Sequence, residues 1–194
     1  MTVKKTQKES KSIKAIAIKP VIPPKISTIE IECEIAKYFG IRKNIIVPNI
    51  SWGLSGMHEC DIFIIKPTGF AVEVEIKISK SDLLADFKKD HNHIDRKNRI
   101  CEFYYAMPKD LYEKCKDLIP EGAGIISTEW YYNAYYMKWV LHTTTQRGAT
   151  RIKGAKRLTD AEQLKVAKLG TMRIWTLKAK IIKNDKAKVQ QHTK

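Results

Sequence analysis

Two short segments bring together residue types that suit chemistry at a phosphate group. Asp61 stands at the start of an apolar run, and segment 72–77 (VEVEIK) alternates apolar with charged residues. Because alternate residues of a strand face opposite sides, Glu73, Glu75 and Lys77 share one face. Three charges among apolar neighbours are costly to bury unless solvent, a metal ion or each other satisfies them.

A tight turn is expected to bring Asp61 beside the other charges. Residues 60–66 (CDIFIIK) and 70–78 (FAVEVEIKI) have the composition of strands, and the KPTG sequence between them is typical of a turn. In the resulting hairpin, Asp61 pairs near the end of the second strand, close to Glu75 and Lys77.

These residue types suit metal-assisted hydrolysis of a phosphodiester. The carboxylates of Asp61 and Glu75 can hold Mg²⁺ or Mn²⁺ through oxygen and leave positions for water and phosphate. The metal activates water and stabilises charge on the phosphate. Lys77, on the same side, can orient the attacking water or offset negative charge. The alternative is a surface strand whose Glu and Lys form ordinary cross-strand ion pairs.

Further elements are expected on both sides of this hairpin. A helix over 29–39 begins at Ser27 or Thr28, ends at Gly40 and buries a stripe of apolar residues spaced four apart. The other expected elements are a strand over 44–48, a helix from Asp82 towards Arg99, a strand over 102–107, a helix over 110–118 and a strand over 123–127.

The C-terminal part of the chain has a weaker pattern. Residues 129–142 are predicted as one long strand or as a hairpin, and the polar, basic residues 143–157 as a loop. Thr159, with Glu162 three residues later, forms a capping-box sequence. It predicts a helix that ends at Gly170.

The spacing Asp61…Glu75-Ile76-Lys77 resembles the signature of the PD-(D/E)xK nuclease superfamily, with Cys60 in place of the proline. Segments 81–88 (SDLLADFK) and 103–108 (FYYAMP) are similar to those of the MmcB-like DNA-repair group and related phage nucleases. In those proteins the ExK strand leads into a helix and then into another strand. The resemblance covers about residues 29–127.

The resemblance implies an α/β fold of the restriction-endonuclease-like kind, in which helices flank a mixed central β-sheet. It also implies that Asp61 and Glu75 are metal ligands, with the backbone carbonyl of Ile76 as a third ligand. Lys77 would be the catalytic lysine.

Such nucleases often place a glutamate of the first helix near the metal. Glu30 and Glu34 compete for that role, with a slight preference for Glu34, and Glu32 is expected to point elsewhere. A solvated helix face is the alternative for both candidates.

The formal net charge of +15 is concentrated at the two ends of the chain. Residues 1–25 carry net +6, residues 26–146 carry net −2 and residues 147–194 carry net +11. We therefore divide the chain into a basic arm (1–25), a nuclease-like domain (26–142) and a basic loop with a helical extension (143–194).

Basic ends indicate a polyanionic partner, here DNA. The alternative is a pair of solvated lysine-rich tails. The candidate phosphate contacts are Lys97, Arg147, Arg151, Lys153, Lys156 and Arg157.

Aromatic residues are densest between positions 130 and 139. Rings beside basic stretches can stack on exposed bases, but core packing or contact with a second copy in a homodimer is the commoner use of such rings. The residues are Trp130, Tyr131, Tyr132, Tyr135, Tyr136 and Trp139.

Together these patterns predict a Mg²⁺-dependent (endo)deoxyribonuclease that acts in DNA repair, recombination or the processing of phage or mobile-element DNA, with endonuclease and exonuclease action both left open. The alternatives are a non-catalytic nucleic-acid-binding protein with the same fold and a small basic structural protein. No apolar run reaches the roughly 20 residues that span a bilayer. The isolated cysteines and the absence of a secretory leader pattern favour the cytoplasm.

Overall fold

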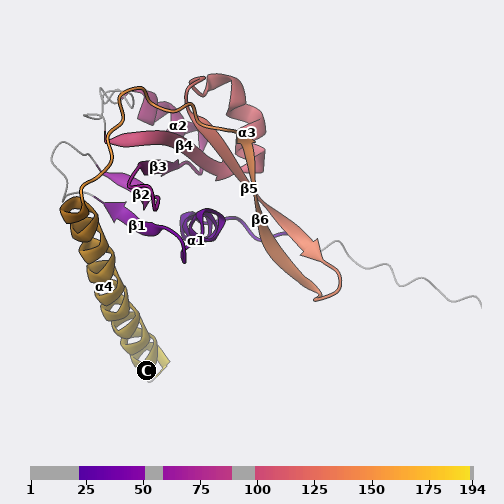
Figure 1. The fold of residues 1–194 in the computed structure, drawn as a ribbon. Helices are drawn as coiled ribbons and strands as arrows, with labels where there is room; N and C mark the ends of the chain where they lie inside the picture. The colour runs from indigo at the N-terminus through magenta and orange to yellow at the C-terminus, as the bar shows by residue number, and fades with distance from the viewer. Residues whose placement is uncertain (1–21, 51–58, 89–98, 193–194) are drawn as a thin grey trace, which may run out of the picture.

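The computed structural model describes residues 22–50, 59–88 and 99–192. Within these residues the chain forms a six-stranded sheet in the order β1-β2-β3-β4-β5-β6, with helices packed against it (Figure 1). The strands are β1 (Ile45–Ile50), β2 (Cys60–Ile65), β3 (Ala71–Ile76), β4 (Ile100–Pro108), β5 (Gly124–Asn133) and β6 (Lys138–Arg147). The helices are α1 (Thr28–Phe39), α2 (Lys80–Phe87), α3 (Lys109–Cys115), the short 3₁₀ helix η1 (Lys116–Leu118) and α4 (Asp160–His192).

The sheet is mixed. Strands β1, β2 and β3 are antiparallel neighbours, β3, β4 and β5 run parallel, and β6 returns antiparallel to β5. Parallel neighbours need a crossover connection. Helix α2 lies in the connection from β3 to β4, and α3 lies in the connection from β4 to β5. The expected α/β class, with a mixed central sheet flanked by helices, is confirmed.

Local sequence signals explain where the first elements begin and end. The side chain of Ser27 caps α1 in a reciprocal capping box with Glu30, and Gly40 ends the helix with φ +83°. The β2–β3 turn closes through a hydrogen bond from Gly69 N to Lys66 O of 2.8 Å, with Gly69 at φ +79°. The predicted hairpin of β2 and β3 is confirmed.

Helices cover both faces of the sheet. Ile31 and Ile35 of α1 pack with Val72, Val74 and Ile76 of β3. The opposite face holds a cluster under α4, which includes Phe63, and a cluster under α2 and α3, which includes Phe103. All six residues of β3 are buried, so the alternative of a solvated surface strand is wrong.

Three sequence expectations need correction. Residues 129–142 form a hairpin, but β6 continues to Arg147, so the loop begins later than predicted. The predicted domain boundary at 142 therefore falls inside β6. The capping box at Thr159 is present, but α4 continues through Gly170 to His192. Helix α2 begins after the cap Ser79 and ends at Phe87. The further part of that prediction, residues 89–98, lies outside the described residues.

Two segments extend away from the sheet. Figure 1 shows the distal part of α4 projecting from one end of the molecule and the β5–β6 hairpin projecting from another side. Within the described residues, no helix is long and apolar enough to cross a membrane.

Candidate active site

The candidate site lies where β2 begins and β3 ends. Ile62 pairs with Val74 across the two strands, so Asp61 and Glu75 occupy the next opposed positions. The Asp61 carboxylate accepts a hydrogen bond from Ile76 N at 2.7 Å. Hairpin register therefore brings together two carboxylates that are separated by 14 positions in the sequence, as predicted.

Lys77 is held between two carboxylates. Its Nζ atom lies 3.1 Å from Glu75 Oε2 and 3.1 Å from Asp86 Oδ1. The other oxygen of Asp86 accepts a hydrogen bond from the Tyr105 hydroxyl at 3.0 Å. Lys77 is only 4% exposed and Asp86 only 3% exposed. Strand β3, helix α2 and strand β4 thus fix the ammonium group in one place.

Negative charge exceeds positive charge in this cluster. Burial raises the pKa of Asp61, with a contribution from nearby acidic side chains. Burial also raises the pKa of Glu75, and the charge of Asp61 adds to the increase. Burial alone would lower the pKa of Lys77, but Glu75 and Asp86 outweigh it and the pKa is raised. Lys77 therefore stays protonated, and its single positive charge does not balance the negative charge of the carboxylates around it.

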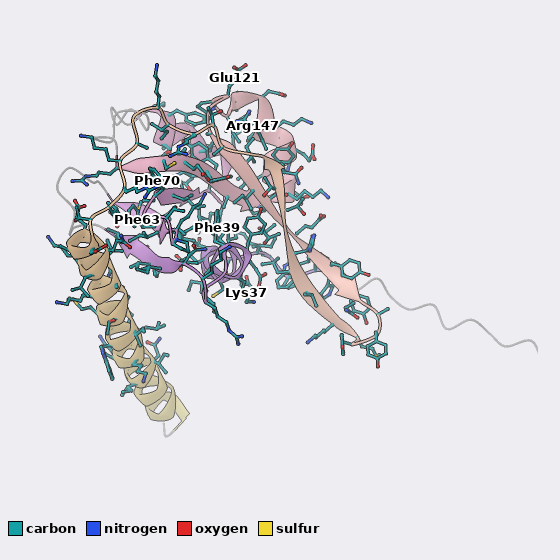
Figure 2. All side chains as sticks on the ribbon, in the orientation of Figure 1. Lys37, Phe39, Phe63, Phe70, Glu121 and Arg147 are labelled. Carbon is teal, nitrogen blue, oxygen red and sulfur yellow. The ribbon has the colours of Figure 1, made fainter. Side chains whose placement is uncertain are left out.

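Helix α1 presents a different glutamate from the one expected. Glu34 forms an ion pair with Lys37 at 2.5 Å, and Figure 2 shows Lys37 pointing away from the sheet. Burial raises the pKa of Glu32, and the charge of Asp61 contributes to that increase. Glu32 also accepts a hydrogen bond from Asn49 Nδ2 at 3.5 Å. The expectation that Glu32 points away from the cluster is wrong, and the catalytic role of Glu34 stays a prediction.

Asp86 is the cluster residue that sequence reasoning did not single out for a role, whereas Glu73 was expected on the face of Glu75 and Lys77. Asp86 lies on α2, three positions after the buried Leu83. A carboxylate on the buried side of a helix is unusual, and it indicates that the carboxylate has a charged or hydrogen-bonding partner. Glu73 is fully buried on β3, on the same face as Glu75.

The donor set fits a hard divalent cation. Mg²⁺ is usually held by one or two carboxylates and keeps several waters, and Asp61 with Glu75 supplies two carboxylates on one side of the sheet. No group of three or more His, Cys, Asp and Glu side chains in the described ranges has the arrangement of a metal site. The fit therefore rests on two carboxylates, with water completing the coordination.

Those predicted phosphate contacts that lie in the described residues are found near the opposite ends of the strands. Arg147 donates hydrogen bonds to the carbonyls of Ala123, Ile119 and Pro120, at 2.9, 3.2 and 2.6 Å. The segment after it crosses the starts of β5, β4 and β3 through hydrogen bonds from Thr150 N to Gly122 O, Ile152 N to Cys101 O and Leu158 N to Gly69 O.

Two arginines of this segment flank Phe70, which precedes β3. The guanidinium of Arg151 lies 4.4 Å from the ring centre and that of Arg157 lies 5.2 Å from it; Arg147 and Phe70 are both labelled in Figure 2. Five residues of strand, about 16 Å, separate Phe70 from Glu75. Lys153 and Lys156 are exposed, and Lys97 lies outside the described residues. The structure does not bring this set beside the carboxylates.

The tyrosines of the aromatic segment are not core residues. Tyr131, Tyr132, Tyr135 and Tyr136 are exposed on the β5–β6 hairpin, whereas Trp130 and Trp139 are partly buried. For the tyrosines, core packing is therefore the wrong explanation.

Comparison with known proteins found no matching family model and no matching curated protein. A solved structure of a protein of unknown function from Silicibacter pomeroyi is similar over 75% of this chain and 84% of that chain, with a TM-score of 0.49 and 17% sequence identity.

Proposed function

We propose that this protein is a Mg²⁺-dependent nuclease of the PD-(D/E)xK type that hydrolyses phosphodiester bonds of DNA. The observation that carries the proposal is the cluster of buried Glu75 and Lys77 with partly buried Asp61 at one end of β2 and β3. Burial and the charge of Asp61 raise the pKa of Glu75, although the ammonium of Lys77 lies 3.1 Å from its carboxylate. A cluster built only for stability would gain from replacing such charges with apolar residues.

Each residue has a separate task in this proposal. Asp61 and Glu75 hold the cation, and Glu32 of α1 adds negative charge beside Asp61. When bound, Mg²⁺ supplies an activated water and stabilises the charge that develops on the phosphate. The ammonium of Lys77 donates hydrogen bonds to the attacking water or to a phosphate oxygen.

Asp86 and Tyr105 are positioning residues. One oxygen of Asp86 accepts a hydrogen bond from Tyr105, and the other lies 3.1 Å from the Nζ atom of Lys77. Two fixed carboxylates hold the ammonium in one orientation, and preorganised donors of this kind lower the cost of stabilising charge in the transition state. As a finer proposal, we assign the enzyme to DNA repair, recombination or phage DNA processing in the cytoplasm.

Site variants test the proposal directly. Asp61→Ala, Glu75→Ala and Lys77→Ala should each abolish Mg²⁺-dependent cleavage of labelled DNA and retain DNA binding in chelator. Lys66→Ala is the matched control, because Lys66 forms an ion pair with Glu102 at 2.7 Å near the opposite end of the sheet. It should cut at the wild-type rate.

Two outcomes contradict the proposal. If all three site variants cut as fast as the control, these residues do not perform the chemistry. The second outcome is a wild-type protein that binds DNA but cuts none of the single-stranded, duplex, nicked and branched substrates in Mg²⁺ or in Mn²⁺. The protein would then be a non-catalytic nucleic-acid-binding protein.

A further inference from the structure

The projecting part of the β5–β6 hairpin carries exposed aromatic residues and lies beside the candidate site. We call this part of the hairpin the aromatic arm. At the tip of the β5–β6 hairpin, Tyr135 is 86% exposed and Tyr136 is 64% exposed, and Tyr131 on the strand is 63% exposed. Large aromatic side chains usually bury most of their surface. Several exposed rings on one narrow arm therefore indicate a surface that binds something.

The aromatic arm begins where the parallel strands end, which is also the end of the sheet at which the site lies. Strands β3, β4 and β5 are parallel, so Lys77, after the end of β3, lies at the edge where β4 ends. Pro108 is the last residue of β4 and pairs with Thr128. Beyond that pair β5 continues for residues 129–133, which extends the arm by about 16 Å. The projection is visible in Figure 1.

A groove lies between Ile78, the residue after Lys77, and the base of the arm. Its volume is about 520 Å³, and Ile78, Pro108 and Trp130 are among its lining residues. Ile78 follows Lys77 directly, and Trp130 belongs to the arm. A chain-like ligand in this groove would therefore extend from the end of β3 to the base of the aromatic arm.

The charges of the groove suit a phosphate backbone. The lysines Lys25, Lys109 and Lys114 line it, against the acidic residues Asp110 and Glu129. Lys109 is paired with Glu129 at 2.8 Å. Lys25 and Lys114 therefore outnumber the remaining acid, and the whole chain carries net +15.

The tip is held in a fixed shape. Asn133 Oδ1 accepts a hydrogen bond from Tyr136 N at 3.1 Å, and Met137 adopts φ +50° in the turn. The rings of Tyr135 and Tyr136 meet edge to face at 4.8 Å, and Lys138 lies 5.4 Å from the centre of the Tyr136 ring. The arm thus presents two largely exposed rings, with the Lys138 ammonium over the ring of Tyr136.

We infer that the arm and the groove bind an unpaired stretch of nucleic acid whose bases stack on Tyr135 and Tyr136. Bases in a duplex are stacked on each other, so only a single strand, a flap or a junction offers free faces, and base–aromatic stacking is tolerant of sequence. This inference rests on the proposed function because it names the substrate class of the same site: single-stranded or branched DNA.

Binding in chelator tests the inference without requiring cleavage. The probe is a fluorescein-labelled single-stranded oligothymidylate, compared with a duplex of the same length by fluorescence anisotropy. The double variant Tyr135→Ala/Tyr136→Ala should bind the single strand at least about 30-fold more weakly, since each of the two stacked rings contributes roughly 1–3 kcal/mol. Its duplex affinity should change little.

Two control variants separate stacking from other effects. Tyr135→Phe/Tyr136→Phe keeps the rings and should bind as wild type. Trp175→Ala removes an aromatic side chain of α4 that is 64% exposed, as Tyr136 is, and should leave the preference for single strands intact. Circular dichroism confirms that each variant is folded.

Three results overturn the inference. The first is an unchanged single-strand affinity in the alanine double variant. The second is an equal loss for Trp175→Ala, which indicates non-specific adhesion. The third is a change from dimer to monomer in sedimentation of the alanine variant, which indicates contact with a second copy. Cleavage that needs Lys77 but not the tyrosines refutes only this inference, whereas single-strand stacking without any cleavage refutes only the nuclease proposal.

Discussion

Replacement of Asp86 by asparagine tests how Lys77 is held. Asp86→Asn keeps the shape of the side chain, and its amide can still bond with the Tyr105 hydroxyl 3.0 Å away. It removes one of the two negative charges that lie 3.1 Å from the ammonium. Because both groups are almost completely buried, we expect a loss of about 1–3 kcal/mol in the free energy of unfolding.

The same substitution should change the pH dependence of cleavage. Asp86 is one of the two carboxylates that raise the pKa of Lys77 above its ordinary value. Without it that pKa falls, so the alkaline limb of the pH–rate profile should move to lower pH. At neutral pH we expect a rate loss of about 10- to 100-fold, the usual cost of removing a residue that orients a catalytic group.

The assay measures single-turnover cleavage across alkaline pH, together with thermal unfolding of the same samples. Glu102→Gln is the control, since it breaks a partly exposed ion pair with Lys66 and should cost less than about 1 kcal/mol without changing cleavage. An Asp86→Asn protein with the wild-type rate and an unmoved alkaline limb would refute the positioning role.

Three further predictions concern charge, packing and the basic helix. Asp61→Asn should abolish cleavage and the stabilisation by Mg²⁺. Since the raised pKa of Asp61 makes the ionised form costly in the folded state, the variant should also unfold at the same or a higher temperature than the metal-free wild type at neutral pH, as calorimetry would detect. The metal-free wild type should correspondingly gain stability as the pH falls towards the carboxylate range. Gly124→Ala should destabilise the fold by about 1–3 kcal/mol in urea, because a Cβ atom there would lie 2.3 Å from the ring of Tyr104 and 2.8 Å from Ala149 N. Removal of residues 174–194, which carry six lysines, should weaken DNA binding and reduce its dependence on salt without slowing cleavage of the bound complex.

The β2–β3 hairpin could be predicted because its signals are local. A turn sequence fixed the register, and strand alternation placed Asp61 and Glu75 on one face. The glutamates of α1 could not be assigned in the same way. Glu32 and Glu34 flank opposite sides of the buried stripe of Ile31 and Ile35, and the position of the helix on the sheet decides which flank approaches Asp61.

Tertiary packing explains two other differences. Gly170 was expected to end a helix, but it lets α4 lie close to β1, since a Cβ atom there would be 3.0 Å from Val47 Cγ2. The threonine-rich residues 143–147 were expected to form a loop because segment 143–157 is polar and basic and contains Gly148 and Gly154. They form the end of β6 instead, because an edge strand needs no apolar outer face and threonine favours extended backbone.

The location of the basic segment 148–157 limits what it can do for the substrate. It crosses the starts of β3, β4 and β5, whereas the carboxylates, the groove and the aromatic arm lie at or beyond the ends of these strands. A strand of nucleic acid that runs from the cluster along the groove moves away from Arg151 and Arg157, whose guanidinium groups already lie against Phe70. Net charge alone therefore does not identify the binding surface: these arginines contribute to packing and to the long-range field, and the recognition surface that we propose lies at the opposite ends of the strands.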